Sequence, residues 1–176
     1  MWLKDLLLVE ARIQEEMENV RLLVDSLKQR GLFPLKEAGK ALLRDDYLLR
    51  AVASVLLDYY TVAENIFKEV AKVIDGKVPE GQDWHKELLV QMKLNISGIR
   101  PPVLSKDTFR QLDEYRRFRH LVRHLYGFNL LPDKVETLLE NLPEINKNLK
   151  RDLTCFLKKM KDLILESYAD QAVPPE

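Results

Sequence analysis

The sequence has a single cysteine, only six glycines and no long apolar run. Cys155 alone excludes an intramolecular disulfide and a cysteine-based zinc site, and we expect a reducing, cytoplasmic compartment. No stretch approaches the ~18 apolar residues of a membrane span. Charged residues interrupt the short apolar stretch at the start, so we expect no signal peptide. With 46% hydrophobic and 32% charged residues, the composition favours helices over disorder.

The charges cancel, because Lys and Arg total 28 and Asp and Glu total 28. Global charge therefore favours neither nucleic acid nor membrane as a partner, and any basic site must be local. A chain of 176 residues buries roughly 70% of its unfolded surface and needs no metal to hold a core. We predict one domain over residues 1–176, with 169–176 as a frayed tail, and no cofactor.

Residues 2–30 are predicted to form a long helix with one apolar face. Leucine, isoleucine or valine recurs every seven residues, at Leu6, Ile13, Val20 and Leu27. Gly31 then fits a helix C-cap. The apolar stripe is suited to a partner helix in the same chain or in a second chain.

Four further helical regions follow, separated by glycine, proline or aspartate. A second long helix runs from about Leu35 or Asp45 to Ile74, and a short helix with Asp83 as its N-cap covers 84–96. The next spans about 105–127, and the last spans about 131–168, where Pro143 either kinks one helix or begins another. The predicted fold is all-α, an antiparallel bundle of about five helices, the first and second long.

The segment around residue 120 separates into an apolar and a cationic side when residues are placed at ~100° intervals. The predicted packing sector holds Phe118, Leu121, Val122 and Leu125. The opposite side holds Arg116, Arg117, Arg119, His120, Arg123 and His124. Arginine binds phosphate oxygens through a fixed fork, and histidine exchanges protons near neutral pH. These are the two roles that metal-free RNA cleavage requires.

Arg119 and His124 do not form a compact pair on a straight helix. Five residues separate them, so they point ~140° apart with a rise of ~7.5 Å. A shared site requires a bend near Gly127 or a symmetry-related copy. A two-fold dimer would place both arginines and both histidines around one cleft.

These residues resemble a known motif. Arg119-x4-His124 fits the Arg-x(4–6)-His signature of HEPN domains, and Tyr126 completes the Arg-x4-His-x-Tyr form of HepT-like toxins. The resemblance extends over roughly residues 40–165, through the segments 58–67, 81–85 and 115–127. Many relatives have asparagine after the arginine, where this chain has His120.

The resemblance implies a HEPN-type helical bundle that forms a homodimer with the motif at a composite cleft. It implies a metal-independent endoribonuclease, the toxin of a toxin–antitoxin pair, with Arg119 on the scissile phosphate and His124 as general base or acid. The partner antitoxin would be a minimal nucleotidyltransferase that adenylylates Tyr126. Supporting roles are expected for His120, Arg123 and Arg116 at phosphate and for Glu64 in orienting a cation.

Alternatives remain for each part of this prediction. The chain could be a non-catalytic HEPN module that binds nucleotide or RNA, or that regulates a nucleotidyltransferase. It could also be a structural protein that uses the apolar stripe of 2–30. Arg119 and His124 could form a solvated face, Tyr126 could be a core residue and Glu64 a surface acid. For His85, structural hydrogen bonding is favoured.

Overall fold

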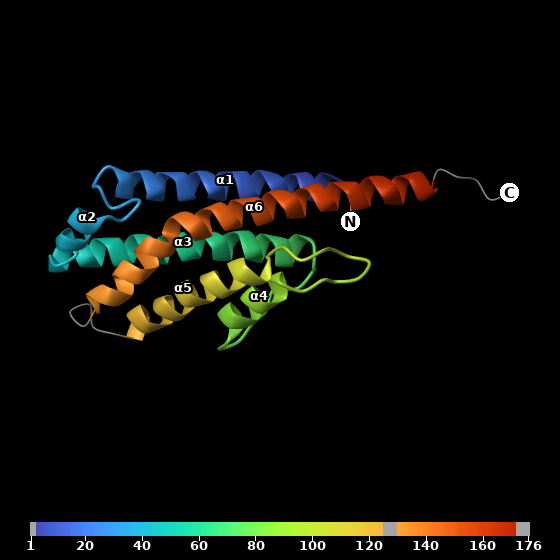
Figure 1. Ribbon diagram of the computed structural model, residues 1–176. Coiled ribbons are helices and arrows are strands. Elements are labelled where there is room, and N and C mark those ends of the chain that lie inside the picture. Colours follow the sequence, from blue (N-terminus) through green and yellow to red (C-terminus); the bar gives the residue numbers. More distant parts are fainter. Residues whose placement is uncertain (1–2, 125–129, 172–176) are drawn as a thin grey trace.

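Six helices make up the part of the chain that the computed structural model describes, residues 3–124 and 130–171, with side chains for 3–122 and 130–167 (Figure 1). In chain order they are α1 Leu3–Lys28, α2 Glu37–Leu42, α3 Asp46–Val73, α4 Trp84–Met92, α5 Lys106–His124 and α6 Pro132–Gln171. The described ranges contain no strand, only an isolated bridge between Ile96 and Arg100. The predicted all-α class is confirmed, with six helices where about five were expected.

α1 packs on the rest of the molecule through the seven-residue stripe. Leu6, Ile13, Val20 and Leu27 are all buried, and α1 lies against α3 and α6. The stripe therefore faces helices of its own chain. The hypothesis of a structural protein required this stripe to be open to a partner chain, and in the structure it is already covered. No helix in the described ranges is long and apolar enough to cross a membrane.

A glycine-dependent turn follows α1. The amide of Leu32 donates to the carbonyl of Leu27 at 2.9 Å, and the amide of Gly31 donates to the carbonyl of Lys28 at 3.0 Å. These two bonds define the Schellman motif, whose C′ residue takes a left-handed conformation. Gly31 has φ of +67°, so the predicted C-cap is confirmed.

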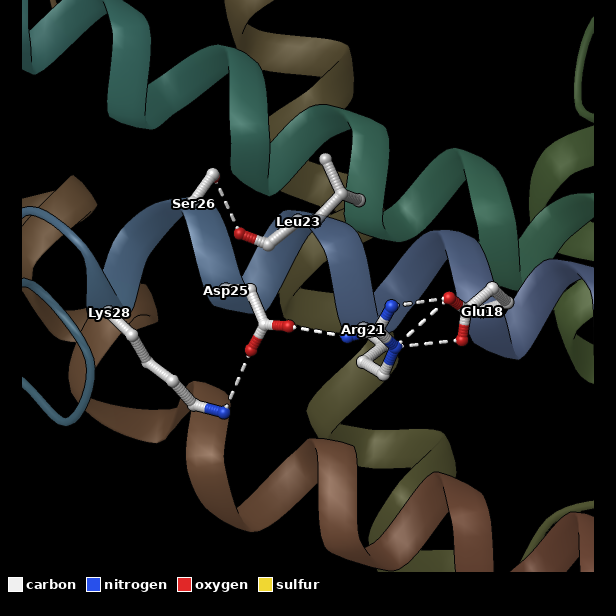
Figure 2. Close-up of polar contacts among 6 residues, drawn as sticks. All are labelled: Glu18, Arg21, Leu23, Asp25, Ser26 and Lys28. Atoms are coloured by element: carbon white, nitrogen blue, oxygen red, sulfur yellow. Dashed lines mark hydrogen bonds and ion pairs between the residues drawn. The ribbon is translucent and has the colours of Figure 1, made fainter.

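The outward face of α1 is a ladder of charged side chains (Figure 2). Arg21 lies between Glu18 and Asp25, with ion-pair distances of 2.6 and 2.8 Å, and Asp25 also accepts from Lys28 at 3.0 Å. Pairs three or four residues apart on an exposed helix face support the helix itself. The charged side chains of this face therefore stabilise α1 itself.

The region predicted to form a second long helix from about Leu35 or Asp45 forms two helices, α2 and α3. The alternative that started one helix at Leu35 is therefore wrong. Asp45 caps α3, because its side chain accepts from the amide of Leu48 at 2.8 Å. The short α2 precedes this cap and is held to α6 by Lys40, which lies 3.1 Å from Glu136 and 2.7 Å from Glu140.

α3 is the central helix of the bundle. It contacts α1, α4, α5 and α6, and Figure 1 shows it running between α1 on one side and α5 and α4 on the other. Buried side chains therefore lie on much of its surface, as the dense apolar sequence predicts. Among them are Leu49, Val52, Leu56, Tyr59, Tyr60, Ala63, Glu64, Phe67 and Val70.

The connection between α4 and α5 is organised by a buried arginine. α4 ends at Met92, four residues before the predicted Ile96. The Arg100 side chain is fully buried and donates to Asp75 at 2.5 and 2.7 Å, and also to the carbonyls of Gln91 and Leu94 at 3.0 and 3.1 Å. Arg100 thus satisfies carbonyl groups in the last turn of α4 and just beyond it, which lack a partner within the helix.

α6 is one continuous helix of 40 residues with Pro143 inside it. Figure 1 shows its orange N-terminal part at an angle to its red C-terminal part, as a proline within a helix produces. Of the two predicted outcomes, the kink is confirmed. The helix extends to Gln171, three residues into the segment 169–176; that this segment is frayed stays a prediction.

Candidate functional site

The candidate site lies where α3, α4 and α5 meet. A cavity of about 300 Å³ opens between α4 and α5. It is lined by Gln82, Asp83, His85, Lys86, Arg116, Arg119 and His120. Three of these residues are permanent cations and one is a carboxylate, so the lining is suited to an anion.

α5 turns a different face to the core from the one predicted. Among its residues up to 122, whose side chains the structure describes, the buried ones are Thr108, Leu112, Tyr115, Phe118 and Arg119. Leu121, predicted to pack, is 38% exposed, whereas Arg119, predicted on the solvent side, is 8% exposed. At ~100° per residue, Arg119 falls between Leu112 and Tyr115 on the packing stripe. The predicted packing face of α5 is therefore rotated about the helix axis, by most of ~90°, from the face that the structure buries.

A buried cluster explains how an arginine occupies this face. Glu64 of α3 is 1% exposed, and its Oε2 lies 3.5 Å from Arg119 Nη2. His85 of α4 contacts Glu64 Oε1 through Nδ1 and lies 2.8 Å from Arg119 Nη1 through Nε2. We call these three residues the Glu64–His85–Arg119 cluster. A buried cation needs such partners, because an uncompensated charge in a low-dielectric interior is strongly destabilising.

Aromatic contacts fix the histidine of the cluster. The ring centroids of Trp84 and His85 are 3.5 Å apart with an interplanar angle of 33°. Lys68 of α3 places its Nζ 4.4 Å from the centroid of the Trp84 ring, a cation–π distance. The His85 ring is therefore held by stacking as well as by its polar contacts.

The rest of the cavity wall is more exposed. Arg116 is half-buried and pairs with Asp113 at 2.6 Å, while Arg117 pairs with the same carboxylate at 2.8 Å. His120 lies on the exposed side of α5 and lines the cavity one residue after Arg119. The wall thus combines fixed positive charge with an imidazole that can exchange a proton.

Tyr60 lies beneath this wall on α3. Its hydroxyl is buried and has no hydrogen-bond partner among the described residues. Burial, and then the nearby Glu64 carboxylate, raises the pKa of Tyr60 well above its usual range. The phenol therefore stays neutral at physiological pH, and the side chain contributes packing rather than a nucleophile.

The predicted site residues divide into three groups. Arg119, His120 and Arg116 line one cavity, and Glu64 lies behind it in contact with Arg119. The side chains of Arg123 and His124 lie outside the described residues, although α5 extends to His124. Tyr126 and the predicted helix end at Gly127 lie wholly outside them.

Two features of the site were not predicted. Gln82, Asp83 and Lys86 line the cavity, and Asp83 makes no side-chain cap bond to α4. Helix periodicity carries no signal for such contacts, because they depend on how α4 docks against α5. For His85 the favoured expectation, structural hydrogen bonding, agrees with its contact to Glu64.

The lining can bind an oxyanion and exchange a proton. The described residues contain no group of three or more His, Cys, Asp or Glu side chains that could hold a metal ion. Arginine and lysine bind phosphate through charge-assisted hydrogen bonds. A phosphate ester is therefore the ligand class that this chemistry fits.

Comparison with known protein families gives a match that agrees with the fold and identifies the family of the chain. The family model described as HepT-like protein matches residues 51–160. No curated protein and no solved structure gave a match. The matched residues include every residue of the cavity lining and of the Glu64–His85–Arg119 cluster. Because the match covers more than half of the sequence, the chain belongs to the HepT-like family of the HEPN superfamily.

Proposed function

We propose that the protein is a metal-independent endoribonuclease of the HEPN type. The observation that carries the proposal is the position of Arg119, which the buried carboxylate of Glu64 holds in the wall of a cationic cavity. A guanidinium fixed in this way is preorganised for the charge that develops on a phosphate in the transition state. Membership of the HepT-like family supports the same activity.

In the proposed reaction, the ribose 2′-oxygen attacks the adjacent phosphorus while His124 takes the 2′-hydroxyl proton. The bond between phosphorus and the 5′-oxygen breaks, and a protonated imidazole supplies a proton to that leaving oxygen. Arg119 stabilises the phosphorane charge, with Arg116, His120 and Arg123 as further contacts for phosphate. The products carry a 2′,3′-cyclic phosphate and a 5′-hydroxyl.

The partners are part of the proposal. We infer a homodimer whose two motifs share one cleft, which would bring together the residues that a single straight helix keeps apart. We also infer a minimal nucleotidyltransferase antitoxin that adenylylates Tyr126, adding a negative charge beside the phosphate site. Co-expression with such an enzyme should add the mass of AMP to the protein, and Tyr126→Phe should abolish that addition.

Cleavage of a labelled RNA in excess chelator tests the activity. We expect wild type to release cyclic-phosphate ends and His124→Ala to lose about 10²- to 10⁴-fold in kcat/KM, the usual contribution of a general base or acid. Cleavage that disappears with chelator, or that is equal in His124→Ala, would contradict the mechanism. Light scattering of the same samples establishes whether the tested species is a dimer.

A non-catalytic binding module is the second candidate. The observation in its favour is that Arg119 is only 8% exposed and ion-paired, as a structural or binding arginine can also be. Calorimetry with a short RNA separates the two. Binding that Arg119→Lys weakens, in a dimeric protein that never cleaves RNA, would replace the ribonuclease with this function.

A further inference from the structure

The imidazole of His85 is engaged at both nitrogen atoms. Nδ1 contacts Glu64 Oε1, while Arg119 Nη1 lies 2.8 Å from Nε2 and 3.1 Å from Nδ1. The His85 side chain is still 23% exposed and lines the cavity. The ring therefore connects a buried carboxylate, a buried guanidinium and the space where a ligand would bind.

These contacts favour one protonation state. An ionised carboxylate only accepts hydrogen bonds, and a guanidinium only donates them. Arg119 Nη1 is closer to Nε2, at 2.8 Å, than to Nδ1, at 3.1 Å, whereas Glu64 contacts Nδ1. The arrangement therefore favours a hydrogen on Nδ1, facing Glu64, and a lone pair on Nε2, facing Arg119. The other neutral tautomer would oppose two acceptors at Glu64, and a doubly protonated ring would oppose two donors at Arg119.

We propose that His85 is a positioning residue of this site: its neutral Nδ1–H tautomer bridges Glu64 and Arg119 and holds the guanidinium at the cavity wall, so that acid pH weakens phosphate binding by protonating His85. The inference rests on the proposed function, because it assigns the Arg119 guanidinium to RNA phosphate. Stacking against Trp84 restricts the ring to this orientation. Holding an arginine in place lowers the entropy that phosphate binding must overcome.

Charged and titratable groups face His85 from each of the three helices. They are Glu64 and, behind Trp84, Lys68 from α3; Asp83 and Lys86 beside it at the start of α4; and Arg116, Arg119 and His120 from α5. His120 and the later His124 are further histidines of α5. A test of His85 must therefore compare variants in which these two histidines are unchanged.

The matched substitution is His85→Gln. Its amide supplies one donor for Glu64 and one acceptor for Arg119, but it does not take up a proton in this range. The measurement is the affinity of wild type and His85→Gln for a 2′-O-methyl RNA oligonucleotide, which cannot be cleaved, between about pH 5 and 8. The other histidines are the same in both proteins, so their effects cancel in the ratio of the two affinities.

We expect similar affinities for wild type and His85→Gln near pH 8. The ratio should then fall by about tenfold or more towards pH 5, as loss of one hydrogen bond to a charged group predicts. His85→Ala should bind about 10- to 100-fold more weakly than His85→Gln at pH 8. A pH-independent ratio, or equal binding by His85→Ala and His85→Gln, would overturn the inference.

Nitrogen-15 spectra of the histidine rings test the tautomer without any activity. The His85 signals are identified by their loss in His85→Gln, and we expect a protonated Nδ1 and a bare Nε2 at pH 8. A protonated Nε2 would overturn the inference whether or not RNA is cleaved. The expected tautomer and pH-dependent binding, in a protein that never cleaves RNA, would refute the ribonuclease alone; no binding by wild type at any pH would refute both.

Discussion

Removing the charge of Asp75 should destabilise the protein strongly. The Arg100 side chain is 0% exposed and the Asp75 side chain 5% exposed, with two bonds between them of 2.5 and 2.7 Å. Asp75→Asn preserves the volume but leaves the guanidinium buried without its counter-charge. Breaking a buried pair in this way costs about 3–5 kcal/mol. For a chain of this size, about 2–4 °C per kcal/mol gives a fall in melting temperature of about 6–20 °C.

The assay is thermal unfolding followed by circular dichroism, with Glu15→Gln as the matched control. Glu15 pairs with Arg12 at 2.8 Å, but both side chains are more than half exposed, so its loss should leave the melting temperature unchanged. The double variant Asp75→Leu/Arg100→Met should recover part of the loss, because it removes both charges. Equal melting temperatures for Asp75→Asn and Glu15→Gln would refute the reasoning.

Three further substitutions test other parts of the fold. Gly31→Ala should lower the unfolding free energy by about 1 kcal/mol in urea titration, because φ is +67° and the added Cβ meets nothing within 4 Å; an unchanged midpoint would contradict the left-handed cap. Burial opposes ionisation of Asp152, but hydrogen bonds from Thr108 and Ser105 outweigh it and hold the pKa of Asp152 below the usual 3.8. Asp152→Asn should therefore destabilise the protein at pH 7 and lose this effect as the pH falls through that lowered pKa. An effect that does not depend on pH would refute this. Lys40→Met should raise amide exchange in α2 and spare α3, since it removes the contacts to α6; unchanged exchange in α2 would show that the contacts do not hold it.

Features set by local sequence were predictable. The seven-residue recurrence located the buried face of α1, and Gly31 located its end, because both depend on residues within a few turns. Asp45 also marked the start of α3 as one of two alternatives, and its side-chain cap is a local bond. Fold class followed from the same helix-scale signals.

Features set by distant partners were not predictable from periodicity. α4 ends before the predicted Ile96, and Arg100, from the far side of a loop, donates to the carbonyls of Gln91 in its last turn and of Leu94 just after it. Arg119 is buried although it is charged, because Glu64, from another helix, is placed to compensate it. A pattern that treats every arginine as solvent-facing therefore rotated the packing face of α5. Only tertiary contacts decide such cases.

For the candidate site, the sequence predicted that Arg116, Arg119 and His120 lie together on one helix, but it did not predict that Arg119 is buried. Arg119, His120 and Arg116 do share one cavity, but the sequence analysis expected a solvent-exposed cationic strip. Glu64 is buried and lies 3.5 Å from Arg119, which agrees with the alternative of an acid beside a cation of α5 and contradicts the alternative of a surface acid. The functional roles of Arg119 and His124 remain predictions, as do the dimer and the antitoxin partner.

The central claim is that Arg119, held by Glu64, acts on RNA phosphate without a metal. The most direct measurement is kcat/KM for RNA cleavage in excess chelator by wild type, Arg119→Lys and Arg110→Lys. Arg119→Lys keeps a charge beside Glu64 but loses the planar fork, while Arg110 is an exposed arginine on the same helix, paired with Asp107. We predict a loss of about 10²- to 10³-fold in Arg119→Lys alone. Equal cleavage by all three proteins, or no cleavage by wild type as a dimer, would contradict the account.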